Sequence, residues 1–353
     1  MAVYSKLTGH RRSDEVVDTL RAIACLALVS FHVVGNSPAA GMELISDHWL
    51  SVVNRTFSDM RMPLFSFLSG LVFVSLDRTS RSSYALIGSK VRRLLLPMLS
   101  VGALFWMARD MMGQGQQPLA TIAFMPFAHF WFLQATFLIM VTFIAISALS
   151  GGRSTLVAVG LMCFGASFWV FGILPKSNVF SVVQALYLAP FFMCGYLCGR
   201  VRLPKIHGVA AFVILSGLSG LGYLLATNFL VVDPTARRAI CVGSGLLFCA
   251  TLLSIRPQNR MLASLGAMSY TIYLFHVFFT AGMGELIGYV WPQMPVILIW
   301  LSCMACGVFG PIALYQFITL NWLTSFVFLG VRASGPPRRT PVLSAIETAF
   351  GKA

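Results

Sequence analysis

The stretch DTLRAIACLALVSFHVVG, residues 18–35, reads as a membrane-spanning helix that carries two groups a lipid core excludes. Arg21 and His32 are eleven residues apart, so at about 100° per residue their side chains project within about 20° of each other. At about 1.5 Å per residue they are separated by roughly 16 Å along the axis, half the thickness of a hydrocarbon core. The spacing predicts Arg21 at a membrane surface and His32 near the midplane, where an ionisable group indicates a functional site.

The composition extends this reading to the whole chain. Of the 353 residues, 58% are hydrophobic and only 10% are charged, and the mean hydropathy is +0.82. Soluble domains carry about 25% charged residues, so we expect an all-α, polytopic integral membrane protein. The net charge of +14 would suggest a nucleic-acid partner for a soluble chain. Here we attribute it to cytoplasmic segments that face anionic lipid, and we expect no nucleic-acid partner.

Apolar runs predict about ten transmembrane helices within one transmembrane domain, residues 1–335, followed by a short, mobile cytoplasmic tail, residues 336–353. The last run is long, and Pro311 is expected to interrupt it. The predicted runs are 18–36, 60–76, 94–112, 129–149, 154–174, 179–199, 207–230, 236–255, 268–290 and 296–328.

The basic residues predict the orientation. With both termini cytoplasmic, nineteen of the 25 Lys and Arg residues fall on the cytoplasmic side, as the positive-inside rule requires. The longest outer loops, at about 37–59 and 113–128, are the expected substrate vestibule. The six basic residues left on the outside are Arg55, Arg61, Arg109, Lys176, Arg237 and Arg238.

The eight cysteines lie inside apolar runs, and we expect them to be packing residues. One CxxC and one CxxxC pair occur, but no second Cys or His cluster completes a metal site. The sequence therefore predicts no metal.

His32 admits two interpretations. It could fill the helix bundle through a hydrogen bond to a neighbouring helix. It could instead act as a general base, because neutral imidazole accepts a proton from a hydroxyl group near neutral pH.

A basic cluster, Lys90, Arg92 and Arg93, lies in KVRRLLLP at the cytoplasmic mouth of the third predicted helix. Basic residues flank membrane helices for topological reasons alone. Arginine also presents a planar fork that matches phosphate oxygens, so the cluster could bind phosphate. Asp18, one turn before Arg21, could orient that guanidinium through an i,i+3 ion pair.

Several further polar residues could contribute to a site, although none is specific alone. Aromatic-belt preference already explains HFWFL at the start of the fourth helix, and helix packing explains Ser69 beside Gly70. In the ninth helix, three polar residues of SYTIYLFH share one face, and an acidic residue further on needs a partner or a wet cavity. These secondary candidates are Ser69, His129, Ser269, Tyr273, His276 and Glu285.

Taken together, the motifs resemble those of the acyltransferase-3 family of bacterial membrane O-acyltransferases. Arg21 and His32 match the family's Arg-x(10)-His signature, and MPLFSFLSG is similar to its MPLFFFLSG motif, with Ser66 in place of an aromatic residue. KVRRLLLP resembles its basic third-helix entrance, with adjacent arginines where some members carry Arg-x-x-Arg. HFWFL and LGAMSYTIYLFH resemble its HLWFL and GxxSYxxYLxH motifs. The five motifs occur in order between residues 18 and 276.

The resemblance implies a multi-pass enzyme of the bacterial cytoplasmic (inner) membrane that uses cytosolic acyl-CoA, acetyl-CoA above all, to acylate a hydroxyl of a cell-surface or exported glycan or glycolipid. It implies His32 as general base, or as the site of a covalent acyl intermediate, with Arg21 as its electrostatic partner. Lys90, Arg92 and Arg93 would then contact the donor phosphates. The acceptor, the acyl group, the side of acceptor entry and the oligomeric state stay open.

Two other classes of protein compete with this interpretation. A secondary transporter of a glycan or polar lipid could use His32 and Glu285 as a proton relay, although the sequence has no inverted repeat. A non-catalytic sensor or scaffold would not depend on His32 for activity.

Overall fold

The computed structural model describes residues 2–35, 41–77, 83–114, 117–201 and 203–331, and the predicted tail at 336–353 lies outside them. The regular elements of these residues are all helical. Within the described ranges, eight helical segments are long and apolar enough to cross a membrane, or nine if the bent pair Trp49–Thr56 and Ser58–Val74 forms one span. The remaining expected span, residues 154–174, corresponds to the shorter apolar helix Ser154–Val170. The chain is thus an all-α, multi-pass membrane protein.

In chain order the α-helices are α1 (Ala2–Val34), α2 (Trp49–Thr56), α3 (Ser58–Asp77), α4 (Ser83–Lys90), α5 (Leu96–Met111), α6 (Trp131–Leu149), α7 (Ser154–Val170), α8 (Val182–Cys198), α9 (Gly208–Ala226), α10 (Pro234–Ile255), α11 (Arg260–Ala267), α12 (Ser269–Val290), α13 (Val296–Ile318) and α14 (Trp322–Leu329). A π-helix, η1 (Val91–Leu95), joins α4 to α5, and three short 3₁₀ segments are η2 (Leu119–Ala123), η3 (Ala128–Phe130) and η4 (Val179–Ser181).

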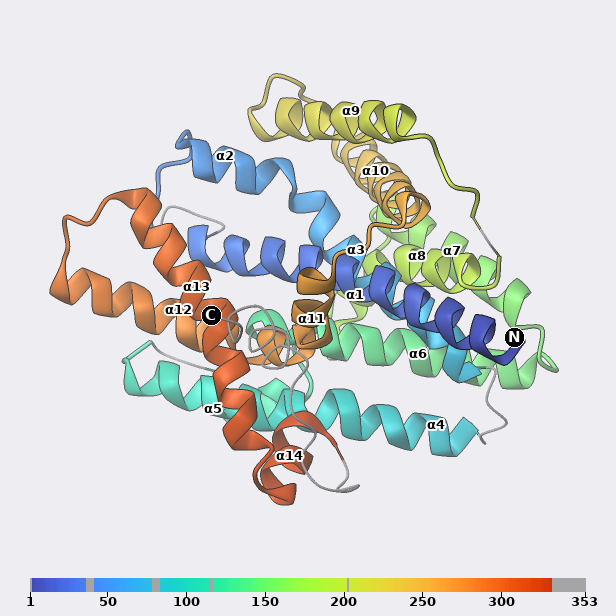
Figure 1. Ribbon diagram of the computed structural model, residues 1–353, viewed down its shortest axis with the longest axis horizontal. Helices are drawn as coiled ribbons and strands as arrows, with labels where there is room; N and C mark the ends of the chain where they lie inside the picture. The colour runs from blue at the N-terminus through green and yellow to red at the C-terminus, as the bar shows by residue number, and fades with distance from the viewer. Residues whose placement is uncertain (1, 36–40, 78–82, 115–116, 202, 332–353) are drawn as a thin grey trace.

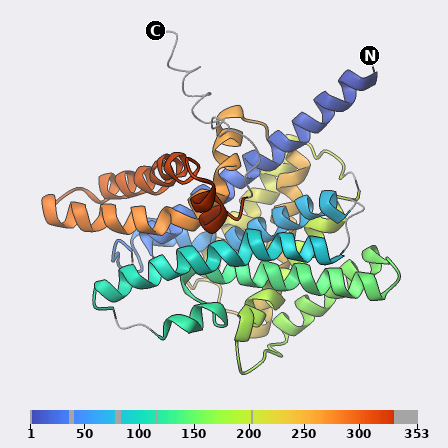
Figure 2. The same ribbon diagram turned by 90° about the horizontal axis from the view of Figure 1, so that it is seen from below.

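The helix that contains Arg21 and His32, α1, runs through the middle of the bundle (Figure 1). It packs against α3, α11, α12 and α13. At one edge of the bundle lies α9, and α4 and α5 lie along the opposite edge (Figure 1). Side by side, α12 and α13 project together to one side (Figure 2). Because α1 is central, the neighbouring helices cover the part of its surface that faces into the bundle.

Small residues allow α3 and α8 to approach closely. A Cβ added at Gly70 would overlap the Phe192 carbonyl, and one at Gly195 would overlap the Phe67 carbonyl. Ser66 donates a hydrogen bond from Oγ to the Leu188 carbonyl at 3.0 Å. An aromatic side chain at position 66 would be too large for this close approach, so Ser66, like Gly70 and Gly195, allows the two helices to pack closely.

The basic KVRRLLLP segment lies inside a continuous helical span, Ser83–Met111, rather than before a helix that starts at 94. The prediction missed eleven residues at the start because Arg92 and Arg93 interrupt the apolar pattern. From Val91 to Met111 the helix rises by about 30 Å, so the basic cluster still lies one hydrocarbon thickness from the other end. A π-helical turn, η1, carries both arginines, and such turns frequently occur at functional sites.

The last apolar run contains a break, but Pro311 does not cause it. Pro311 lies inside α13, and the helix ends after Ile318. Asn321 then caps α14 by accepting a hydrogen bond at its side-chain oxygen from Leu323 N at 2.8 Å. The expected interruption therefore exists, but it lies between Ile318 and Trp322 instead of at Pro311.

Candidate functional site

Three histidines from distant parts of the chain meet beside α1. The ring centroid of His32 lies 4.9 Å from that of His276 and 5.8 Å from that of His129. The rings of His129 and His276 are 5.1 Å apart. The three come from α1, η3 and α12, so the fold assembles a histidine cluster that no local stretch of sequence contains.

Hydrogen bonds from α12 hold two members of this cluster. Nδ1 of His276 lies 3.0 Å from the Ile272 carbonyl oxygen and 2.9 Å from that of Tyr273. A ring nitrogen facing two acceptors must be the N–H donor, which leaves Nε2 of neutral His276 with its lone pair. The hydroxyl of Tyr273 donates to the backbone carbonyl of His129. This bond fixes the segment that carries His129 against α12.

The three rings differ in accessibility. His276 is fully buried and His129 is 5% exposed, whereas His32 is half-buried. The Nε2 atoms of His129 and His276 are buried and have no hydrogen-bond partner among the described residues. Unpaired buried nitrogens are costly in a protein interior. His32 is thus the member that a substrate could reach, with two polar atoms behind it.

Contacts along α11 and α12 place the basic residues at one end of this site. Gly266 lies against the backbone of Asp18, and the Tyr270 hydroxyl donates to the carbonyl of Arg93. Tyr270 follows Gly266 by only four positions in the chain. From Tyr270 to His276 the helix rises about 9 Å, and from Asp18 to His32 about 21 Å. Both helices therefore lead from the basic end toward the histidines.

The ion pair expected near the start of the membrane segment is present. Nη1 of Arg21 lies 2.8 Å from Oδ1 of Asp18, one turn earlier on α1. Their side chains are 32% and 26% exposed, respectively. Such a partly exposed pair contributes little to stability, about 0–1 kcal/mol, so its main effect is to orient the guanidinium.

The three residues of the basic cluster differ in how much of their side chains contacts other parts of the protein. Nε of Arg92 donates to the Gly330 carbonyl at 2.9 Å, which joins η1 to the end of α14. Nζ of Lys90 lies 5.3 Å from the centroid of the Phe73 ring. Arg93 is exposed. The three cations thus lie within four consecutive residues, at the end of α4 and on η1, and Arg92 also joins η1 to α14.

Other secondary candidates lie apart from the cluster. Ser69 donates to the Phe65 carbonyl at 2.8 Å within its own helix, and Ser269 is half-buried at the start of α12. Glu285, which was expected to need a partner or a wet cavity, is exposed. It lies nine residues beyond His276, about 13 Å along α12. A His32–Glu285 relay therefore has no structural support.

One residue near the cluster was missed by the sequence analysis. Arg61 was counted among the outer basic residues, but it is only 7% exposed. Its guanidinium carbon lies 4.1 Å from the centroid of the Phe31 ring, and Phe31 packs against His32 with ring centroids 5.1 Å apart. The rule that identified His32, an ionisable group within an apolar run, would have identified Arg61 as well.

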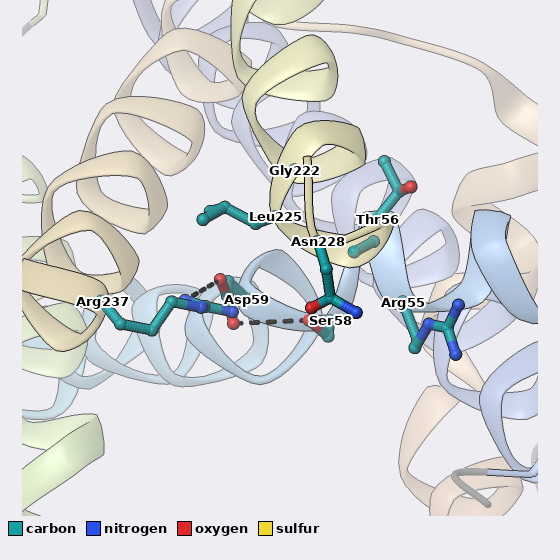
Figure 3. Close-up of a pocket in the computed structure, with 9 residues that line it drawn as sticks. Arg55, Thr56, Ser58, Asp59, Gly222, Leu225, Asn228 and Arg237 are labelled. Carbon is teal, nitrogen blue, oxygen red and sulfur yellow. Dashed lines mark hydrogen bonds and ion pairs between the residues drawn. The ribbon is translucent and has the colours of Figure 1, made fainter. Parts of the chain in front are cut away.

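A separate polar cavity of about 260 Å³ lies where the α2–α3 elbow meets the facing ends of α9 and α10 (Figure 3). Within it, Nη1 of Arg237 binds Oδ2 of Asp59 at 2.6 Å, and Ser58 donates to the same carboxylate at 3.4 Å. None of the three histidines lines this cavity. The Arg237–Asp59 ion pair joins α10 to α3, and the cavity lies outside the histidine cluster.

No arrangement of three or more His, Cys, Asp or Glu side chains among the described residues is suited to hold a metal ion.

The family follows from a comparison with known proteins. A family model described as an acyltransferase domain, that of the acyltransferase-3 family, matches residues 14–316. This chain is a membrane acyltransferase of that family. The match begins within α1, at residue 14, and ends near the end of α13, so it includes all three histidines of the acyltransferase. No curated protein and no solved structure matches the chain significantly.

Proposed function

We propose that the acyltransferase moves an acyl group, with acetyl as the expected one, from cytosolic acyl-CoA to a hydroxyl of a cell-surface or exported glycan or glycolipid. We further propose the bacterial cytoplasmic membrane as its location. The observation that carries the proposal is the half-buried His32, backed by His129 and His276, in a chain of this family.

In this mechanism His32 is the general base. It accepts the proton of the acceptor hydroxyl while that oxygen forms a bond to the thioester carbonyl carbon. The tetrahedral intermediate collapses, the carbon–sulfur bond breaks, and the CoA thiolate takes the proton back from His32. His129 and His276 border the base and exclude bulk water from it. A covalent acyl-His32 intermediate is the alternative role for the same residue.

The donor is proposed to bind at the basic end. Arg93 and Lys90, with Arg92 beside them, offer positive charge for the CoA phosphates. The Tyr270–Arg93 contact supports this, since it brings the cluster onto the helix that carries His276. Arg21, oriented by Asp18, adds a fourth cation near the same junction.

Thiol release from acetyl-CoA tests the proposal, with purified protein in lipid and with or without a membrane glycan extract. We expect extract-dependent release by the wild type that is lost in His32→Ala. The matched control is His207→Asn, because His207 is an exposed cap of α9 and Asn also caps helices. Equal release by wild type and His32→Ala would overturn the role of His32. Absence of release with acetyl, succinyl and longer donors would overturn the reaction itself.

A further inference from the structure

Arg61 has an environment that packing does not explain. It lies on the first turn of α3, is 7% exposed, and donates from Nη1 to Asn54 O at 3.0 Å and to Asn54 Oδ1 at 2.5 Å. A guanidinium has five N–H groups on three nitrogens. Nη2 and Nε have no hydrogen-bond partner among the described residues. Donors therefore remain for another acceptor.

The charge of Arg61 also lacks a carboxylate in direct contact. The nearest acidic residue on α3 is Asp59, two residues earlier, and it faces the polar cavity (Figure 3). There its carboxylate is held by Arg237 at 2.6 Å. No ion pair joins Arg61 to an acidic side chain in the described part of the chain. A buried cation in a membrane bundle is costly unless it has a function or a partner.

Arg61 is next to the histidine cluster. Its guanidinium stacks over Phe31 at 4.1 Å, and Phe31 both precedes His32 in sequence and contacts its ring. The contact fixes the position of the charge, because a cation over an aromatic face is attracted to it. Asn54 in turn donates to the Gly35 carbonyl at 3.2 Å, which anchors Arg61 to the end of α1. The guanidinium is preorganised one side chain away from His32.

We infer that Arg61 is the anion-binding group of this site, and that its guanidinium binds the carbonyl oxygen of the acyl group. This inference rests on the proposed acyl transfer. As the acceptor oxygen forms its bond to the carbonyl carbon, the carbonyl π electrons move onto oxygen, and Arg61 stabilises that negative charge. The charge returns to the carbonyl when the carbon–sulfur bond breaks, so Arg61 neither gains nor loses a proton.

Such a donor acts mainly on the transition state. Removal of a single oxyanion-stabilising donor typically lowers kcat by 10²–10³-fold. Arg61→Gln should therefore lower the kcat of acyl transfer by about 10²–10³-fold and leave acyl-CoA affinity within about threefold, since phosphate contacts lie elsewhere. Arg61→Lys, which keeps the charge but not the fork, should recover part of the loss.

The matched control is Arg238→Gln. Arg238 is likewise an arginine over an aromatic ring, with its guanidinium carbon 5.5 Å from the Trp169 centroid. It is half-buried and contacts α7 through Trp169. We expect this control to keep wild-type kcat. Guanidinium chloride at a concentration that leaves the wild type folded should partly restore Arg61→Gln, whereas it should not change the control.

The outcomes separate the two levels of inference. If wild type transfers acyl groups and Arg61→Gln stays within tenfold of it, the role of Arg61 is refuted. A parallel loss of thermal stability and acyl-CoA affinity, without rescue by guanidinium, would assign Arg61 a structural role only. If Arg61→Gln does not fold, kcat equal to wild type in a folded Arg61→Met refutes the role. Wild type without acyl transfer would instead refute the proposed function.

Discussion

Two tyrosines on α12 offer a paired test of how the site is held. The hydroxyl of Tyr273 donates to the carbonyl of His129, and that of Tyr270 donates to the carbonyl of Arg93. Phenylalanine keeps the ring and removes only the hydroxyl, so neither substitution opens a large cavity. Each leaves a backbone carbonyl without this donor, which costs about 1–3 kcal/mol where the group is buried.

The two substitutions should differ in their kinetic effects. Tyr273→Phe loosens the segment that carries His129, and a positional error worth about 1 kcal/mol in the transition state slows a step roughly fivefold. We expect kcat to fall about 5–10-fold with little change in the KM for acyl-CoA. Tyr270→Phe should instead raise the KM for acyl-CoA and leave kcat within about twofold, because it loosens the basic end.

The assay is acyl transfer under saturating donor, with the thermal unfolding midpoint measured on the same preparations. Tyr273→Phe should lower the midpoint more than Tyr270→Phe, because the hydrogen bond of Tyr273 is buried and that of Tyr270 is exposed. Since both variants lose the same chemical group from one helix, each is the control for the other. The reasoning is refuted if Tyr273→Phe keeps full kcat despite a lowered midpoint, or if the two variants show the same change in kcat and KM.

Three further predictions follow from the packing and the charges. Gly70→Ala should lower the free energy of unfolding by about 1–3 kcal/mol or more, because the added Cβ overlaps the backbone of α8. At Gly88 an added Cβ meets nothing within 4 Å, so Gly88→Ala should stabilise the protein slightly. Thermal unfolding of the two variants checks the contrast, and equal midpoints would contradict the close approach. Asp18→Asn should change the free energy of unfolding by less than about 1 kcal/mol but lower turnover, since Arg21 loses its orienting partner; unchanged turnover would contradict a role for that pair. Arg92→Ala should weaken acyl-CoA binding, measured by titration, and unchanged affinity would remove it from the donor site.

The sequence was sufficient for the membrane class and for the central helix. In residues 18–35, apolar composition defines the span, and the spacing of Arg21 and His32 predicts a functional site on it. Helix boundaries were harder to predict where charged residues interrupt an apolar run. At Arg92 and Arg93 the pattern stops, yet the backbone continues as a π-helical turn between two α-helices. Hydropathy records solvent preference and not backbone continuity.

The site itself depended on tertiary contacts. His129 follows a long loop and is typical of an aromatic belt by position, but the fold buries it beside His32 and His276. No spacing rule relates residues 97 and 147 positions apart. Glu285 is the opposite case, because helix α12 projects from the bundle (Figure 2) and the side chain is exposed. Arg61 was overlooked because it stands at the outer end of the predicted run 60–76 and was counted with the outer basic residues.

The most direct test of the catalytic role of His32 is the transfer of label from [¹⁴C]acetyl-CoA into the glycan fraction. Proteoliposomes would contain wild type, His32→Ala or the His207→Asn control, with the donor supplied to one side only. The account predicts label in the glycan with wild type and His207→Asn, and a loss of at least about 10²-fold with His32→Ala at equal folded yield. Label transfer by His32→Ala at the wild-type rate would contradict the account.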